Sequence, residues 1–81
     1  MIHLTHRYEM RDGVAHIVIY AYTPIDYEFA TDFGTIKYNA NNTANKIREY
    51  ARENLKAPSN PPVMVIVNGV IIGSVPLNSL I

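Results

Sequence analysis

The chain has 81 residues, 48% apolar and 17% charged, a balance typical of a single folded domain, residues 1–81, rather than of a disordered chain. Seven basic and seven acidic residues give no net charge, so the total charge does not favour electrostatic capture of nucleic acid or of an anionic membrane. The chain has no cysteine, which excludes disulfides, thiol redox chemistry and cysteine-based metal sites.

The sequence carries no targeting or membrane-spanning signal. No run approaches the roughly 20 apolar residues that a membrane-spanning helix needs, and residues 1–7 lack the basic-then-apolar layout of a signal peptide. We therefore expect a cytoplasmic protein without membrane association. A domain of this size buries a modest core, and oligomerisation is a common way to stabilise one that has no disulfide or metal. A homodimer is therefore expected.

Residues 1–22 predict a first hairpin around an Asp12-Gly13 turn. A two-residue turn places Tyr8 opposite Ile17 and Met10 opposite Ala15, which makes one face of the hairpin almost wholly apolar. A three-residue loop would mix polar and apolar side chains, so the two-residue turn is favoured. The other face then holds His3, Thr5, Arg7, Glu9, Arg11, Val14, His16, Val18, Tyr20 and Tyr22.

The middle of the chain predicts one amphipathic helix, from about residue 43 to residue 57. Asn42 or Thr43 can cap it, and the prolines within residues 58–62 end it. Its apolar face is formed by residues at helical spacing: Ala44, Ile47, Ala51 and Leu55. Residues 25–34 suit either a short strand or one or two helical turns, and residues 35–38 suit a short strand. The apolar tail, residues 76–81, is expected to pack down.

Residues 62–75 predict a second hairpin, because two β-branched runs flank Asn68-Gly69, a pair typical of a type I′ turn. Neither face of this hairpin is polar, and a strand that is apolar on both faces is expected in the middle of an assembly. An uninterrupted pairing places Val75 on the face away from Val63, and Gly73 within the strand suggests a bulge. A dimer interface is therefore predicted at Val65, Val67, Val70 and Ile72.

Together these elements predict an α+β fold. Its mostly antiparallel sheet consists of two main hairpins, residues 1–22 and 62–75, plus short middle strands, with the helix of about 43–57 packed on one face. One helix covers only one face of a sheet. The other face must be covered either by the sheet closing on itself or by a second copy, and both alternatives stay open.

The sequence shows no constellation of catalytic or metal-binding residues, and no cofactor is expected. A metal site needs three or four ligands around one ion, whereas His3 and His6 point to opposite faces of a strand. His16 lies opposite Glu9, which predicts a surface pair between these two side chains. An acidic cluster consists of Asp26, Glu28 and Asp32. Aromatic residues lie between these acidic residues, which is not typical of a calcium-binding loop. We therefore expect neither a bound metal nor an enzyme.

The polar face of the first hairpin is the candidate binding surface. Aromatic and cationic side chains on an open sheet face can bind single-stranded nucleic acid, and tyrosine is also favoured at protein interfaces. The candidate binding residues are Arg7, Arg11, His16, Tyr20 and Tyr22. The leading hypothesis is a small non-enzymatic interaction or regulatory protein, a homodimer that contacts a partner protein through a sheet surface. The alternative is a binder of single-stranded nucleic acid.

A third hypothesis comes from the second half of the chain. Pro61 is followed by a strand, Asn68-Gly69 and a second strand, which resembles the C-terminal half of thioredoxins, as do residues 35–39 with the helix after them. The resemblance covers residues 35–75 at most. It implies a thioredoxin-like module, and the lack of cysteine makes that module a non-redox one.

Overall fold

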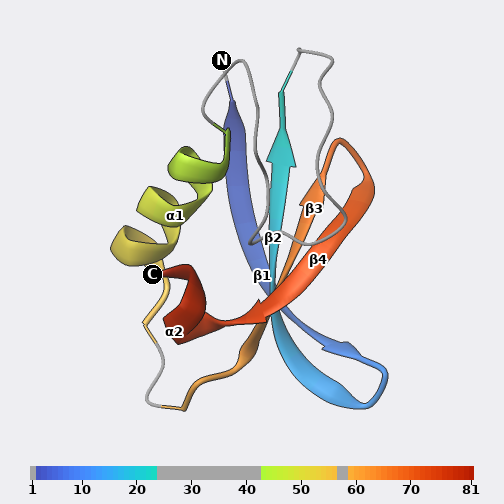
Figure 1. Cartoon of the computed structure of the whole chain (residues 1–81). Helices are drawn as coiled ribbons and strands as arrows, with labels where there is room; N and C mark the ends of the chain where they lie inside the picture. The colour runs from blue at the N-terminus through green and yellow to red at the C-terminus, as the bar shows by residue number, and fades with distance from the viewer. Residues whose placement is uncertain (1, 24–42, 57–58) are drawn as a thin grey trace.

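Figure 1 shows the computed structural model of the chain, which describes residues 2–23, 43–56 and 59–81. Four strands form one sheet in the order β1-β2-β3-β4. In chain order the elements are β1 His3–Arg11, β2 Val14–Tyr22, α1 Thr43–Asn54, β3 Pro62–Val67, β4 Val70–Pro76 and α2 Leu77–Leu80. The predicted α+β class and the two predicted hairpins are confirmed.

The β1–β2 hairpin has the predicted register. Tyr8 lies opposite Ile17 and Met10 lies opposite Ala15. The two turn residues, Asp12 and Gly13, have φ values of 52° and 77°, and a type I′ turn requires positive values at both positions. The separation of apolar from polar side chains thus predicts this register correctly, because a shift by one residue would exchange the faces.

A parallel pairing of β2 with β3 joins the two hairpins into one sheet. Ile17 pairs with Val63 and Ile19 with Val65, while α1 lies in the connection between these strands, as a parallel pairing requires a long crossover. The sheet is therefore mixed, with antiparallel pairings on either side of the parallel one. Strands in the centre of a sheet are buried on both faces, and Val18, whose neighbours in β2 face the helices, is indeed fully buried.

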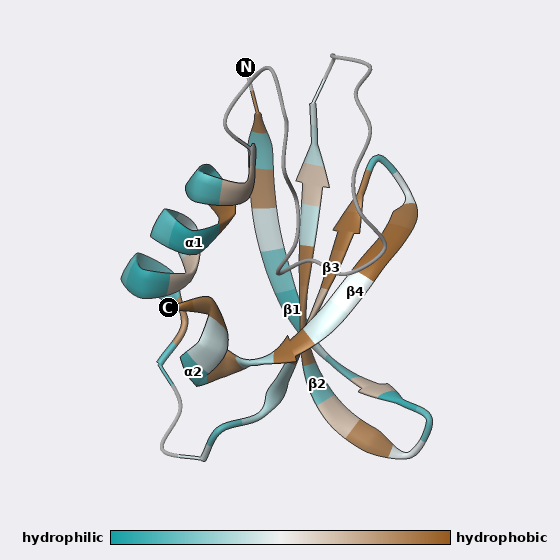
Figure 2. Cartoon of the chain, in the orientation of Figure 1, coloured by the Kyte–Doolittle hydropathy of each residue, from teal (hydrophilic) through white to brown (hydrophobic). Residues whose placement is uncertain are grey.

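The last strand, β4, forms an edge of the sheet, which corrects the expectation that the whole second hairpin lies in the middle. Val70 is 61% exposed and Ile71 is 56% exposed, and Figure 2 shows apolar colouring along this part of β4. Only β3 of this hairpin takes the central position that its composition predicts.

A β-bulge interrupts the pairing of β3 with β4 near the glycine that suggested it. Ile66 pairs with Ile71, but the preceding residue, Val65, pairs with Gly73. β4 therefore contains one residue more than β3 across this step. The extra residue corrects the predicted face of Val75, which packs against the helix-side core instead of facing away from it.

Both helices pack on the same face of the sheet (Figure 1). α1 buries the predicted apolar face, although it ends at Asn54, earlier than predicted. α2 buries Leu77 and Leu80, so the C-terminal tail packs down as expected. The helix-side core contains Ile17, Ile19, Ala21, Ile47, Ala51, Leu55, Val63, Val65, Val67, Ile72, Leu77 and Leu80. Neither of these helices is long and apolar enough to cross a membrane, and the described residues contain no other candidate.

Some predictions fall on residues outside the described ranges. They are the alternatives for residues 25–34, the short strand at residues 35–38, and helix capping by Asn42 or by the side chain of Thr43. The acidic cluster of Asp26, Glu28 and Asp32 also lies outside these ranges.

Candidate functional site

Tyr20 is the centre of a polar network on the sheet face that points away from the helices. The guanidinium of Arg7 lies over its ring, 5.3 Å from the ring centroid, at the distance of a cation–π contact. The Tyr20 hydroxyl donates a hydrogen bond to the Glu9 carboxylate and accepts one from Arg11 at 3.4 Å. β1 supplies both arginines and the glutamate because its odd-numbered side chains share this face.

The Glu9 carboxylate also pairs with both arginines. The Nε atom of Arg7 lies 3.3 Å from one carboxylate oxygen, and a terminal nitrogen of Arg11 lies 3.0 Å from the other. The hydrogen bond from Tyr20 and, after it, the contacts with Arg11 and Arg7 lower the pKa of Glu9 below its usual 4.5. The network therefore favours an ionised Glu9, and it carries two positive charges and one negative charge.

The structure brings together three of the five predicted binding residues. Arg7, Arg11 and Tyr20 form the network, whereas Tyr22 lies opposite His3 at the far end of the hairpin and is 52% exposed. Sequence reasoning did not place Glu9 among the binding residues, although the alternation of β1 puts it between the two arginines on one face.

His16 does not join the network. Its Nδ1 atom lies 2.8 Å from the backbone carbonyl oxygen of Val14. Glu9 lies directly opposite His16 in the ladder, but the carboxylate is taken by Tyr20 and the arginines. The predicted cross-strand position of Glu9 and His16 is therefore confirmed, but the structure shows no hydrogen bond or ion pair between the two side chains.

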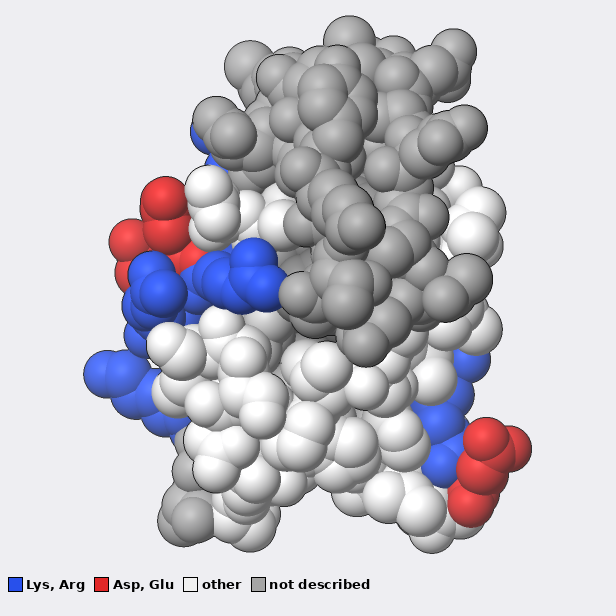
Figure 3. Space-filling view, viewed as in Figure 1, with Lys and Arg blue, Asp and Glu red and all other residues white. Residues whose placement is uncertain are grey.

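The network is poorly suited to hold a nucleic acid strand. Stacking of a base on Tyr20 would displace Arg7, which already covers one face of the ring, and a phosphate near the arginines would lie close to the Glu9 carboxylate. Figure 3 likewise shows basic and acidic atoms side by side over the β1–β2 hairpin. Binding of single-stranded nucleic acid usually depends on a positively charged groove with accessible aromatic rings.

Three exposed apolar side chains lie toward the turn end of the β1–β2 hairpin. β2 pairs with β3 only from Ile17 onward, so among the described strands residues 14–16 pair with β1 alone. Tyr8 and Met10 are 69% and 68% exposed, and Val14 is 49% exposed. These side chains therefore offer apolar area that a partner could bury.

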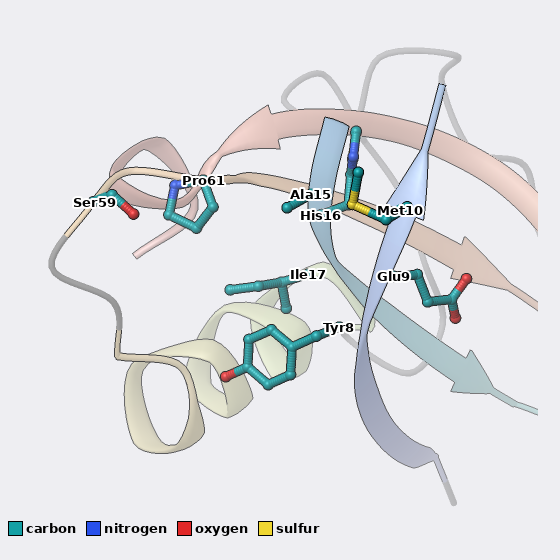
Figure 4. Close-up of a pocket in the computed structure, with 8 residues that line it drawn as sticks. All are labelled: Tyr8, Glu9, Met10, Ala15, His16, Ile17, Ser59 and Pro61. Atoms are coloured by element: carbon teal, nitrogen blue, oxygen red, sulfur yellow. The ribbon is translucent and has the colours of Figure 1, made fainter. Parts of the chain in front are cut away.

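An open groove of about 320 Å³ lies beside this hairpin end, on the helix side (Figure 4). The Tyr8 side chain points into the region of Ile17, and the Glu9 carboxylate points to the opposite side of β1 (Figure 4). Pro61 and Ser59, before β3, form the far wall. The groove is lined by Tyr8, Glu9, Met10, Ala15, His16, Ile17, Ser59 and Pro61.

Among the described residues, no strand pairs with the outer edge of β1. Because Arg11 pairs with Val14 across the two-residue turn, the odd-numbered residues of β1 direct their backbone N–H and C=O groups to β2. The even-numbered residues direct their backbone groups outward, and in the described part of the chain no strand pairs with these groups. These residues are Leu4, His6, Tyr8 and Met10. β4, at the other edge, contains a bulge and ends in Pro76, two features that discourage further pairing.

The predicted interface residues of the second hairpin lie mostly inside the molecule. Val65, Val67 and Ile72 are 0%, 3% and 8% exposed and belong to the helix-side core. Val70 is 61% exposed. A partner can therefore contact Val70, but the other three side chains are covered by the chain itself.

His6 connects β1 to α1. Its Nδ1 atom lies 2.7 Å from the Tyr50 hydroxyl, and the two rings meet edge to face with centroids 5.6 Å apart. Burial raises the pKa of the Tyr50 phenol above 10.0. His3 lies exposed on the opposite face, and within residues 2–23, 43–56 and 59–81 no three histidine or acidic side chains gather at one point that could hold a metal ion.

Comparisons with known proteins give no relative for this chain. No family model, no curated protein and no solved structure matches it. The resemblance of residues 35–75 to thioredoxins therefore gains no support from them.

Proposed function

We propose that this chain is a non-enzymatic interaction protein that binds another polypeptide along the outer edge of β1. The partner adds a strand to the sheet and covers the exposed side chains of Tyr8 and Met10. The observation that carries this proposal is the combination of a regular nine-residue edge strand with two large apolar side chains about 70% exposed on it. Strand addition to an open sheet edge is a recurring mode of protein recognition.

The two parts of this surface contribute differently. The outward backbone groups of β1 supply hydrogen bonds that any extended chain can make, which gives affinity without sequence preference. The groove beside Tyr8 and Met10 supplies the preference, because an apolar side chain of the partner can enter it and lose contact with water. Complete burial of a side chain such as Met10 contributes about 1.5–3 kcal/mol.

Two other functions stay predictions of lower rank. Binding of single-stranded nucleic acid has Arg7 and Arg11 in its favour, but both contact Glu9. A non-redox thioredoxin-like module has only the resemblance in its favour. The cytoplasmic location also stays a prediction from the sequence.

A peptide-selection experiment tests the proposed function. Peptides are selected from a random display library on the full chain, and NMR then measures their binding through the amide signals of β1. We expect protection from hydrogen exchange at the outward amides of Tyr8 and Met10. Selected peptides that protect only other parts of the chain would contradict the proposal.

Two variants at one position separate the backbone from the side chain. Tyr8→Pro removes one outward N–H and no bond to β2, because Tyr8 and Ile17 form a pair that is not hydrogen-bonded. Tyr8→Thr retains the N–H and removes the ring. Peptide binding should be lost in Tyr8→Pro and weakened in Tyr8→Thr. Equal binding to Tyr8→Pro and to the unchanged chain would overturn the proposal.

A further inference from the structure

We propose that the strand added to β1 is β1 of a second copy, paired antiparallel about a two-fold axis at Tyr8. This inference rests on the proposed function of the β1 edge and names its occupant. Two four-stranded sheets then form one continuous sheet.

The backbone of β1 limits the possible positions of the axis. The outward groups belong to the even-numbered residues. An axis at Tyr8 sets Tyr8 opposite the partner's Tyr8 and sets His6 opposite the partner's Met10, so outward groups meet outward groups at each of these pairs. The exposed Met10 side chain then lies next to a histidine that Tyr50 holds in place.

Charge selects Tyr8 among the neighbouring positions. An axis at Tyr8 sets Arg7 opposite the partner's Glu9, and symmetry repeats this pair. An axis at Arg7 would place two Arg7 side chains against each other, and an axis at Glu9 would do the same with two carboxylates. Like charges directly opposite each other destabilise a pairing, whereas opposite charges stabilise it.

More distant positions of the axis lose these advantages. An axis at His6 sets Arg7 opposite the partner's Thr5, so the charge pairs are not made. An axis at Met10 leaves only residues 9–11 of β1 paired, because the strand ends at Arg11. Tyr8 is the position that combines a long paired segment with opposite charges.

The other edge of the sheet explains why such pairing stops at two copies. A β1–β1 contact uses the same surface on both copies and therefore closes on itself. The remaining free edges are both β4, where the bulge and Pro76 interrupt a regular ladder. A dimer, not a fibre, is the resulting assembly.

A charge exchange tests the register, with solution mass measured by light scattering during size-exclusion chromatography. The unchanged chain should be a dimer. Arg7→Glu and Glu9→Arg should each dimerise at least about tenfold more weakly, since both symmetric pairs become repulsive. A one-to-one mixture of the two variants should form a heterodimer, and the double variant should again dimerise with itself.

Arg11→Glu is the matched control. It also removes a contact to Glu9, but in this register Arg11 lies opposite the partner's Thr5, so the dimer should persist. An unchanged chain that stays monomeric, or a mixture of Arg7→Glu and Glu9→Arg that does not associate, would overturn the proposal. Peptide protection of Tyr8 and Met10 in a monomeric chain would overturn this inference while supporting the proposed function.

Single cysteines locate the axis even if a charge variant does not fold. The chain has no cysteine of its own. In the proposed pairing the two Tyr8 Cα atoms lie about 5.5 Å apart, within the range of about 4.4–6.8 Å that a disulfide spans. Tyr8→Cys should form a covalent dimer on mild oxidation, and His6→Cys should not. Equal crosslinking of both variants, or of neither, would contradict an axis at Tyr8.

Discussion

Glu9 is the residue on which the polar face of the hairpin depends. Its carboxylate accepts a hydrogen bond from Tyr20 and contacts Arg7 and Arg11. The two arginines would repel each other across this short stretch of β1 without the negative charge between them. Glu9 thus compensates part of the positive charge of the two arginines.

The pKa of Glu9 gives a test of this arrangement. Because the pKa in the folded chain lies below the ordinary value, Glu9 stabilises the fold above its ordinary pKa, and this contribution is lost as the pH falls through the lower, folded value. Tyr20→Phe removes the main cause and should raise the Glu9 pKa. NMR titration of the Glu9 carboxyl carbon measures it. Tyr22→Phe, which changes a tyrosine outside the network, should leave it unchanged; an equal shift in both variants would exclude the Tyr20 hydrogen bond as the cause.

Asn68 supplies the second turn with a positive φ, and its side chain also forms hydrogen bonds to the end of β2. Its side chain accepts a hydrogen bond from the Thr23 N–H at 2.9 Å and donates one to the Thr23 carbonyl oxygen at 3.0 Å. Its own N–H donates to the Ala21 carbonyl oxygen at 2.8 Å. Asn68 thereby connects the end of β2 to the β3–β4 hairpin through hydrogen bonds. No local sequence pattern indicates this contact.

Two substitutions of Asn68 separate these contributions. Asn68→Gly tolerates the φ of 50° but loses both side-chain hydrogen bonds, and it should lower the free energy of unfolding by about 1–2 kcal/mol. Asn68→Ala also meets the left-handed backbone penalty and should lower it by about 2–4 kcal/mol. Urea denaturation measures both. Equal losses would show that the φ angle adds nothing, and no loss in either would show that the link to Thr23 is not stabilising.

At the scale of elements, local sequence patterns predict the two hairpins but do not predict the pairing of strands that are distant in the sequence. The Asp12-Gly13 and Asn68-Gly69 turns have positive φ at all four residues, and the register of the first hairpin follows from its apolar face. The parallel pairing of β2 with β3 depends on where α1 directs the chain, which no residue near either strand encodes. The glycine at position 73 suggests a bulge, but only the structure shows which later side chains change face.

Helix α1 packs its apolar face against the sheet. Ile47 is fully buried against the sheet, so Ile47→Ala should lower the free energy of unfolding by about 2–5 kcal/mol and Ile47→Val by about 0.5–1.5 kcal/mol. Lys46→Ala, at the neighbouring exposed position, should change it by less than about 0.5 kcal/mol. Urea denaturation again provides the values. Similar effects at positions 46 and 47 would show that α1 does not dock through this face.

At the scale of the whole molecule, the sequence predicts self-association through the second hairpin, but three of the four predicted interface side chains are buried within the chain. Apolar residues on both faces of a strand have two explanations, burial within one chain or burial against another. Val65 and Val67 are buried within one chain, because α1 and the parallel neighbour β2 cover them. The position of β1 at one end of the described sheet depends on the order of strands, and that order is not visible in the pattern of β1 itself.

Thermal stability should therefore depend on protein concentration. If the native state is a dimer, raising the concentration 100-fold stabilises each chain by about 1.4 kcal/mol, half of the linkage energy of the pair. For a domain of 81 residues this corresponds to a rise in Tm of about 5–10 °C. Tyr8→Pro should show no rise, because it removes an N–H at the centre of the contact and no bond within the chain. Differential scanning calorimetry over a dilution series measures both proteins. The same concentration dependence in both would place the dimer contact away from β1, and a Tm independent of concentration in both would mean that the β1 edge accepts a different polypeptide or none.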